Sequence, residues 1–263
     1  MSSIDAARNR IIQKYHVSPD SQLTCGMKAD VYIYGPDTVL KLYPGTVSLA
    51  EMRTLQDFYH SLDRQLVPYA MPCIHTVAQE AHFLVTVEQR LPGTPMSALL
   101  PKFSRNQLEM MMQRYLTAVL ALSAIQAPPV FDRYKLFDPD NISQRADGDW
   151  HRFIARYIAR KLAQVGHCLR HDVSQFAVKM QQLDAILDQP YHGDIQLIHG
   201  DFFPGNLLVD ENCRITALLD FGLLTMYGDH LFDIATSWVF FDMYDELKAK
   251  ASDRYLAILV NRL

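Results

Sequence analysis

Two short segments in the second half of the chain carry the side chains best suited to chemistry. Residues 198–206 read IHGDFFPGN and place Asp201 five positions before Asn206. Residues 217–222 read ALLDFG and supply Asp220. Phosphoryl transfer needs a carboxylate to orient a hydroxyl and accept its proton, and hard oxygen ligands for a divalent cation that neutralises the phosphates. These residues therefore predict a magnesium-dependent phosphotransfer site.

A β-hairpin is predicted to bring these groups to one edge. Paired strands over 206–209 and 214–219 would return Asp220 to the side of Asn206. His199 belongs to the same loop, and we expect it to brace that loop by hydrogen bonds. The alternative is an ordinary turn rich in Asp, Asn and Gly, and the order and spacing of the groups argue against it.

The elements around this site divide the chain into two predicted regions. We expect a small lobe over residues 1–90 with an antiparallel sheet and one internal helix, and a larger, mainly helical lobe over 91–263 with a short β insert. The LPGTP segment would join them. This is an α+β, bilobal organisation. The predicted helices cover 3–15, 47–62, 104–125, 149–169, 174–188 and 229–262, and the first predicted strands cover 30–35, 38–43, 73–78, 82–88 and 195–198.

Composition narrows the class of partner. The net charge of −4 among 263 residues gives no basic excess for nucleic acid. The four cysteines are scattered without a CxxC pair, which argues against a zinc site or disulfide framework and for a reducing compartment. No apolar leader or membrane-length apolar run is apparent. We therefore expect a soluble, cytoplasmic protein without nucleic-acid or membrane partners, and the sequence leaves the oligomeric state open.

Three motifs, in order, resemble those of the aminoglycoside phosphotransferase family, which are small-molecule kinases related to choline kinase. HGDFFPGN, residues 199–206, resembles the H-G-D-x-x-x-x-N catalytic loop of that family. LLDFG, residues 218–222, is similar to its metal-binding segment and to the D-F-G of protein kinases. GDHLFDIA, residues 228–235, resembles the segment that follows. The HGD form favours the small-molecule branch of these kinases.

The resemblance implies a protein-kinase-like fold and a set of roles. Asp201 would be the catalytic base, with His199 in the same catalytic loop, and Asn206 and Asp220 would bind Mg²⁺. Asp233 would be a structural acid that braces the loop. ATP would be the phosphate donor, with GTP not excluded. The acceptor would be a hydroxyl of a small molecule, such as an aminoglycoside or other antibiotic, an amino alcohol or a sugar-like metabolite.

The resemblance also assigns nucleotide-binding roles in the N-terminal region. Lys41, in the strand TVLKLY, would contact the nucleotide phosphates and pair with Glu51 on the following helix. Gly26 would lie in the loop that covers the phosphates. The linker backbone near Glu88 and Arg90 would bind the adenine edge. The alternatives are a solvated edge-strand position for Lys41 and a helix-surface position for Glu51.

Other functions stay open at this stage. A nucleotide-binding pseudokinase or scaffold would keep the fold without turnover. A protein kinase is disfavoured because no A-P-E segment follows LDFGLL and little sequence remains for an activation loop. Near the C-terminus, Asp242, Asp245 and Glu246 could attract a cationic substrate or could form a solvated helical face.

Overall fold

The computed structural model describes the chain apart from residues 1–2, 26–28, 46, 146–148, 242–250 and 261–263. The predictions for Gly26 and for the acidic residues Asp242, Asp245 and Glu246 therefore lie outside the described residues. Within the described part of the chain, no helix combines the length and the apolar character needed to cross a membrane.

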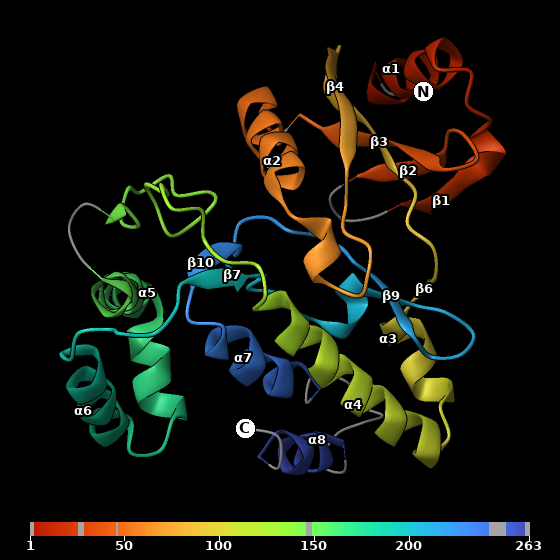
Figure 1. The fold of residues 1–263 in the computed structure, drawn as a ribbon. Coiled ribbons are helices and arrows are strands. Elements are labelled where there is room, and N and C mark those ends of the chain that lie inside the picture. The colour runs from red at the N-terminus through yellow and green to blue at the C-terminus, as the bar shows by residue number, and fades with distance from the viewer. Residues whose placement is uncertain (1–2, 26–28, 46, 146–148, 242–250, 261–263) are drawn as a thin grey trace.

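A five-stranded antiparallel sheet forms the N-terminal region, in the order β1-β2-β3-β5-β4 (Figure 1). Lys41 of β3 lies opposite Thr86 of β5, and Val39 lies opposite Glu88. Because successive side chains of a strand point to opposite faces, this register decides which residues share a face. The strands are β1 Gln22–Cys25, β2 Asp30–Ile33, β3 Thr38–Pro44, β4 Ile74–Glu80 and β5 Phe83–Gln89.

The two faces of this sheet are covered by different helices. Helix α1, Ser3–Lys14, packs on one face, where Leu42 and Val85 join Ile11 in a buried apolar cluster. Helix α2, Leu49–Ser61, covers the other face together with the C-terminal region. The polar side chains of β3 and β5 that matter below lie on this second face, away from α1.

The C-terminal region is mainly helical with short strands between the helices (Figure 1). Helix α4 begins at Arg105, after the N-cap Ser104, whose side chain forms a capping box with Gln107. The helix packs against α7 and α8. Strands β6, β8 and β9 form one small sheet, and β7 pairs with β10. The elements are α3 Met96–Leu99, α4 Arg105–Leu122, α5 Trp150–Asp172, α6 Phe176–Leu187, α7 Leu231–Phe241, α8 Ala251–Val260, β6 Thr94–Pro95, β7 Gln196–Ile198, β8 Leu207–Val209, β9 Ile215–Leu218 and β10 Met226–Gly228.

One continuous core joins the two regions. Phe58 of α2 and Leu84 of β5 belong to the same buried cluster as Tyr115 of α4 and Phe221. A backbone connection reinforces this contact, because Ala70 donates to the carbonyl of residue 216 at 2.9 Å and accepts from the amide of residue 218 at 3.0 Å. The N-terminal region is therefore attached to β9 as well as through the linker at β6.

Candidate active site

The predicted catalytic loop starts where β7 ends, and Asp233 holds it through hydrogen bonds to its backbone. The amides of His199 and Gly200 donate to the two carboxylate oxygens of Asp233 at 2.6 and 2.8 Å. Gly200 has φ of +80°, and a Cβ there would lie 2.0 Å from the carbonyl oxygen of Leu224, so only glycine fits. Asp233 is 2% exposed on α7. The predicted bracing role of Asp233 is confirmed.

His199 ties the catalytic loop to the strand that precedes Asp220. Its Nδ1 accepts from the amide of Asp201 at 3.2 Å, so the proton resides on Nε2, which donates to the carbonyl of Leu219 at 2.7 Å. Its ring also packs edge-on against Phe221, with centroids 4.5 Å apart. Burial lowers the pKa of His199, which keeps the ring neutral. Its contacts are those of the expected strut.

Asp201 and Asn206 contact each other across the loop. Asn206 Nδ2 donates to the backbone carbonyl of Asp201 at 2.9 Å and to its Oδ2 at 3.2 Å. The amide of Asn206 donates to the carbonyl of Phe203 at 2.8 Å, which closes a short 3₁₀ turn. Because Nδ2 is used within the loop, the carbonyl oxygen Oδ1 of Asn206 is the atom left to face a ligand.

The β8–β9 hairpin brings Asp220 to the same edge, as predicted. Leu207 lies opposite Leu218, and beyond that pair the amide of Leu219 donates to the carbonyl of Asn206 at 2.7 Å. Asp220 follows directly and is exposed, with φ of +60°. Aspartate tolerates this left-handed conformation better than most residues, and such outliers gather at functional sites.

The donor set fits a magnesium ion carried by a nucleotide. Asp220 offers a carboxylate and Asn206 an amide oxygen, which are the hard ligands that Mg²⁺ prefers. Mg²⁺ in nucleotide sites takes its remaining ligands from phosphate and water, so two protein ligands suffice. No group of three or more His, Cys, Asp or Glu side chains suited to a metal occurs among the described residues.

Lys41 makes a partly buried ion pair with Glu88 within the N-terminal sheet. Its Nζ lies 2.8 Å from Glu88 Oε2. The other oxygen, Oε1, accepts from the hydroxyls of Thr86 at 2.6 Å and Tyr43 at 3.2 Å. The side chain of Glu88 is 5% exposed and that of Lys41 is 25% exposed. Lys41 is therefore a paired side chain at the edge of the core, not a solvated one.

The predicted pair between Lys41 and Glu51 is wrong in this structure. Ser48 is the N-cap of α2, so Glu51 is its third residue, and the two form a capping box. Glu51 Oε2 accepts from the Ser48 amide at 3.2 Å and from its hydroxyl at 2.8 Å. The buried face of α2 consists of Met52, Phe58 and Tyr59, and Glu51 is exposed.

Electrostatics connects the lysine pair with Asp220. Burial alone would lower the pKa of Lys41, but the charge and hydrogen bond of Glu88, together with Tyr43 and Tyr59, outweigh burial and raise it. Burial raises the pKa of Tyr43 and of Tyr59, and the negative charges of Glu88 and Asp220 raise both further. Glu88 and Asp220, the expected metal ligand, thus raise the pKa of the same two tyrosines.

Two backbone amides of the linker expected to bind the adenine edge donate to other parts of the fold. The amide of Gln89 donates to the carbonyl of Cys73 at 2.9 Å, and the amide of Arg90 donates to that of Asp37 at 2.8 Å. The amides of Gln89 and Arg90 are therefore not free to bind a base, and the binding of the adenine edge by the backbone near Glu88 and Arg90 stays a prediction.

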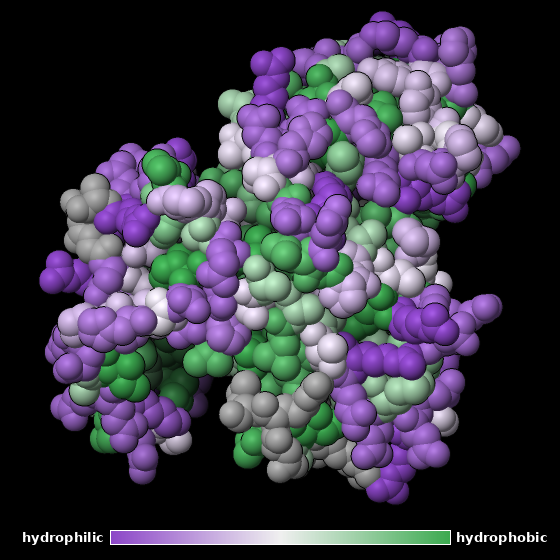
Figure 2. All heavy atoms as spheres, in the orientation of Figure 1, coloured by the Kyte–Doolittle hydropathy of each residue, from purple (hydrophilic) through white to green (hydrophobic). Residues whose placement is uncertain are grey.

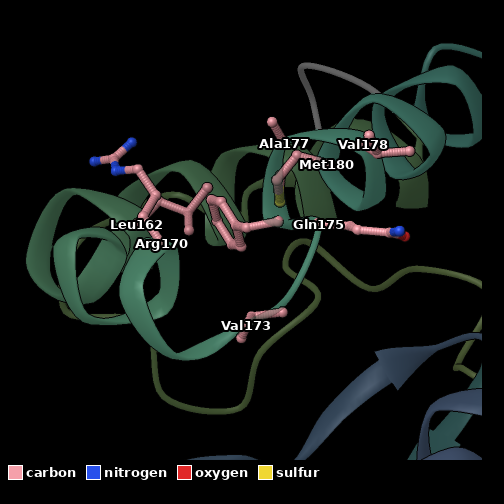
Figure 3. Close-up of a pocket in the computed structure, with 8 residues that line it drawn as sticks. Leu162, Arg170, Val173, Gln175, Ala177, Val178 and Met180 are labelled. Carbon is pink, nitrogen blue, oxygen red and sulfur yellow. The ribbon is translucent and has the colours of Figure 1, made fainter.

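A separate depression of about 690 Å³ lies between α5 and α6 (Figure 3). None of the predicted catalytic or nucleotide-binding residues lines it, and no residue of α6 is buried. Figure 2 also shows a hollow, with apolar side chains in it, between this helix pair and the rest of the C-terminal region. The residues around the depression are Leu162, Arg170, Val173, Gln175, Phe176, Ala177, Val178 and Met180.

Residues 23–259 match the model of the Phosphotransferase enzyme family (APH). The chain belongs to this family. The match covers most of this phosphotransferase-family chain, from β1 to α8, and confirms the resemblance predicted from the three motifs. No curated protein is a significant match to the sequence.

Solved aminoglycoside phosphotransferases share the fold of this phosphotransferase-family chain. ADP-bound APH(2'')-Ib is 15% identical, with a TM-score of 0.59, and the match covers 98% of this chain and 82% of that one. The streptomycin–ATP–APH(2'')-IIa ternary complex is also 15% identical, with a TM-score of 0.57 and coverage of 99% and 84%. APH(3'')-Id from Streptomyces rimosus is 14% identical, with a TM-score of 0.54 and coverage of 98% and 92%. The predicted bilobal, protein-kinase-like α+β fold is confirmed.

Sequence reasoning missed the side-chain role of Glu88. The strand FLVTVEQ carries polar residues at alternate positions, Thr86 and Glu88, within an otherwise apolar run. In a strand buried on both faces, such a pair marks a polar cluster on one face. That pattern could have identified Glu88 as a partner for Lys41.

Proposed function

We propose that this protein is an ATP-dependent kinase that transfers the γ-phosphate to a hydroxyl of a small molecule. The observation that carries this proposal is the meeting of Asp201, Asn206 and Asp220 at one edge, built by hydrogen bonds through Leu219. The proposal includes the division into a nucleotide-binding lobe (residues 1–90) and a catalytic and substrate-binding lobe (residues 91–263), and a cytoplasmic location where ATP is abundant.

In the proposed mechanism, Asp201 orients the acceptor hydroxyl and accepts its proton as the oxygen attacks the γ-phosphorus. Asn206 Oδ1 and the Asp220 carboxylate would hold Mg²⁺, which when bound neutralises charge on the phosphates. Lys41 supports the α- and β-phosphates. His199 stays neutral and keeps the loop in register, so it positions Asp201 and does not transfer protons.

The acceptor is proposed from the relatives and by class only. Streptomycin, gentamicin and kanamycin are named in complexes of structural neighbours that are at most 15% identical to this chain. We therefore place aminoglycosides first among candidate acceptors, followed by other antibiotics, amino alcohols and sugar-like metabolites.

A nucleotide-consumption screen tests this proposal. ATP and GTP would be offered with Mg²⁺ and a panel of these acceptors, after thermal-shift measurements establish which nucleotide binds. Acceptor-dependent consumption that is lost in Asp201→Ala and Asp220→Ala supports the kinase. Nucleotide binding without turnover across the panel would instead favour a pseudokinase, and turnover retained in either variant would refute the mechanism.

A further inference from the structure

The strand register alone sets the contact between Lys41 and Glu88. Lys41 lies opposite Thr86 on adjacent antiparallel strands. Glu88 is two residues further along β5, so its side chain leaves the same face of the sheet as those of Lys41 and Thr86. The 2.8 Å approach of Nζ to Oε2 therefore needs no residue from a helix.

Both oxygens of Glu88 are occupied, which fixes the carboxylate. Oε1 accepts from Thr86 at 2.6 Å and from Tyr43 at 3.2 Å, and Oε2 contacts Lys41. A buried carboxylate is stable only when it is paired and hydrogen-bonded, and these donors meet that requirement. Because two hydroxyls from the same sheet hold the Glu88 carboxylate, the ammonium of Lys41 has one defined position.

Helix α2 presents apolar and aromatic side chains, and no buried charge, to the core on this face of the sheet. Its buried positions are Met52, Phe58 and Tyr59, whereas Glu51 and Asp57 are exposed. Glu51 is held at the N-terminal end of α2 by its capping box with Ser48. Turning Glu51 toward Lys41 would break that box and move the apolar face of the helix out of the core.

We propose that Glu88 is the residue that positions Lys41 for the nucleotide phosphates, and that helix α2 takes no charged part in this contact. The proposal rests on the proposed kinase function and adds a positioning residue to it. Lys41 then keeps its position whatever the orientation of α2. Nucleotide binding is set by the sheet and is not switched by movement of that helix.

Binding of ATP, ADP and adenosine to the wild type, Glu88→Gln and Glu51→Gln tests this role. Glu88→Gln should weaken ATP and ADP by about tenfold or more, because a charge-assisted contact no longer fixes Lys41. Adenosine binding should not change, because adenosine has no phosphate for Lys41 to contact. Glu51→Gln should bind all three like the wild type. The guanine series replaces the adenine series where GTP binds more tightly.

The outcomes separate this inference from the kinase proposal. Wild-type ADP affinity in Glu88→Gln, equal weakening of adenosine and ADP in Glu88→Gln, or weakened ADP binding in Glu51→Gln overturns the positioning role. A wild type that binds neither ATP nor GTP refutes the proposed function itself.

A second pair of variants covers the case in which Glu88→Gln does not fold. Lys41→Met is compared with the double variant Lys41→Met/Glu88→Gln, since neutralising both partners of a buried pair is tolerated better than neutralising one. Because Glu88 acts through Lys41, the double variant should bind ADP no more weakly than Lys41→Met. A further loss of ADP affinity in the double variant overturns the inference.

Discussion

Asp233 and Glu88 are both buried carboxylates, yet they stabilise different kinds of structure. Asp233 accepts from two backbone amides and burial raises its pKa to about 7. Glu88 accepts from two hydroxyls and pairs with the ammonium of Lys41. Neutral amides fix the path of the catalytic loop, whereas a cationic partner fixes the position of one side chain. The same chemical group therefore shapes backbone in one region and orients a charge in the other.

The largest expected effect comes from removing Asp201, a side chain of the loop that Asp233 holds. Asp201→Ala should lower turnover on the order of 10³-fold, because general-base assistance is lost. The fold should persist, since Asn206 keeps its hydrogen bond to the backbone carbonyl of residue 201. Steady-state kinetics together with denaturant unfolding measure both effects. A loss of turnover that unfolding of the variant fully accounts for would contradict a catalytic role.

Asp233→Asn should affect stability as well as turnover. The amide side chain has one acceptor oxygen, so one of the two amides now bound by Asp233 would lose its partner. An unsatisfied buried donor costs about 1–3 kcal/mol, and the free energy of unfolding in urea should fall by that amount. Unchanged stability would show that the loop amides find other partners.

The difference in stability between wild type and Asp233→Asn should change with pH in one direction. The pKa of Asp233 rises from 3.8 to about 7 on folding, so the folded chain binds more protons than the unfolded chain between those values. Its contribution to stability is therefore present at low pH and is lost as pH rises through about 7. The stability advantage of wild type over Asp233→Asn should therefore shrink as pH rises from about 3.8 to about 7 and stay constant above that range. An advantage that grows with pH would mean that the two amides dominate over burial.

The smallest effect is expected at the cap of α2. Ser48→Ala removes the side chain that accepts from the Glu51 amide at 3.1 Å, and should lower the free energy of unfolding by about 1 kcal/mol. ADP affinity should match the wild type, because the Lys41–Glu88 pair lies within the sheet. A clear loss of ADP affinity would mean that the cap of α2 reaches the nucleotide site.

The catalytic loop was predictable because its chemistry is local in sequence. Asp201, Asn206 and Asp220 are joined by one loop and one hairpin, whose spacing fixes their approach. The partner of Lys41 was not predictable in the same way, because it depends on the register of β3 with β5. The position of Glu51 was also mispredicted. The family resemblance would pair it with Lys41, whereas its capping box with Ser48 holds it at the start of α2.

The overall fold was largely predictable, since helices α1, α2, α4, α5, α6 and α7 and the longer strands have clear apolar periodicity. Strand β1, Gln22–Cys25, was not predicted. The short strands β6 and β10 were missed as well. Each has two or three residues, β6 contains a proline and β10 a glycine, so neither carries an alternating pattern. Their pairing comes from tertiary contacts with β8 and β7.

The attachment of Ala70 to β9 has a mechanical consequence. Both connections between the regions, at Ala70 and at β6, end on the sheet formed by β6, β8 and β9. The residues that follow β9 are Leu219, whose amide donates to the carbonyl of Asn206, and then Asp220. A rotation of the N-terminal region would therefore act on the strand that leads into Asp220. The position of Lys41, on the N-terminal sheet, would thus be coupled to that of Asp220 through β9.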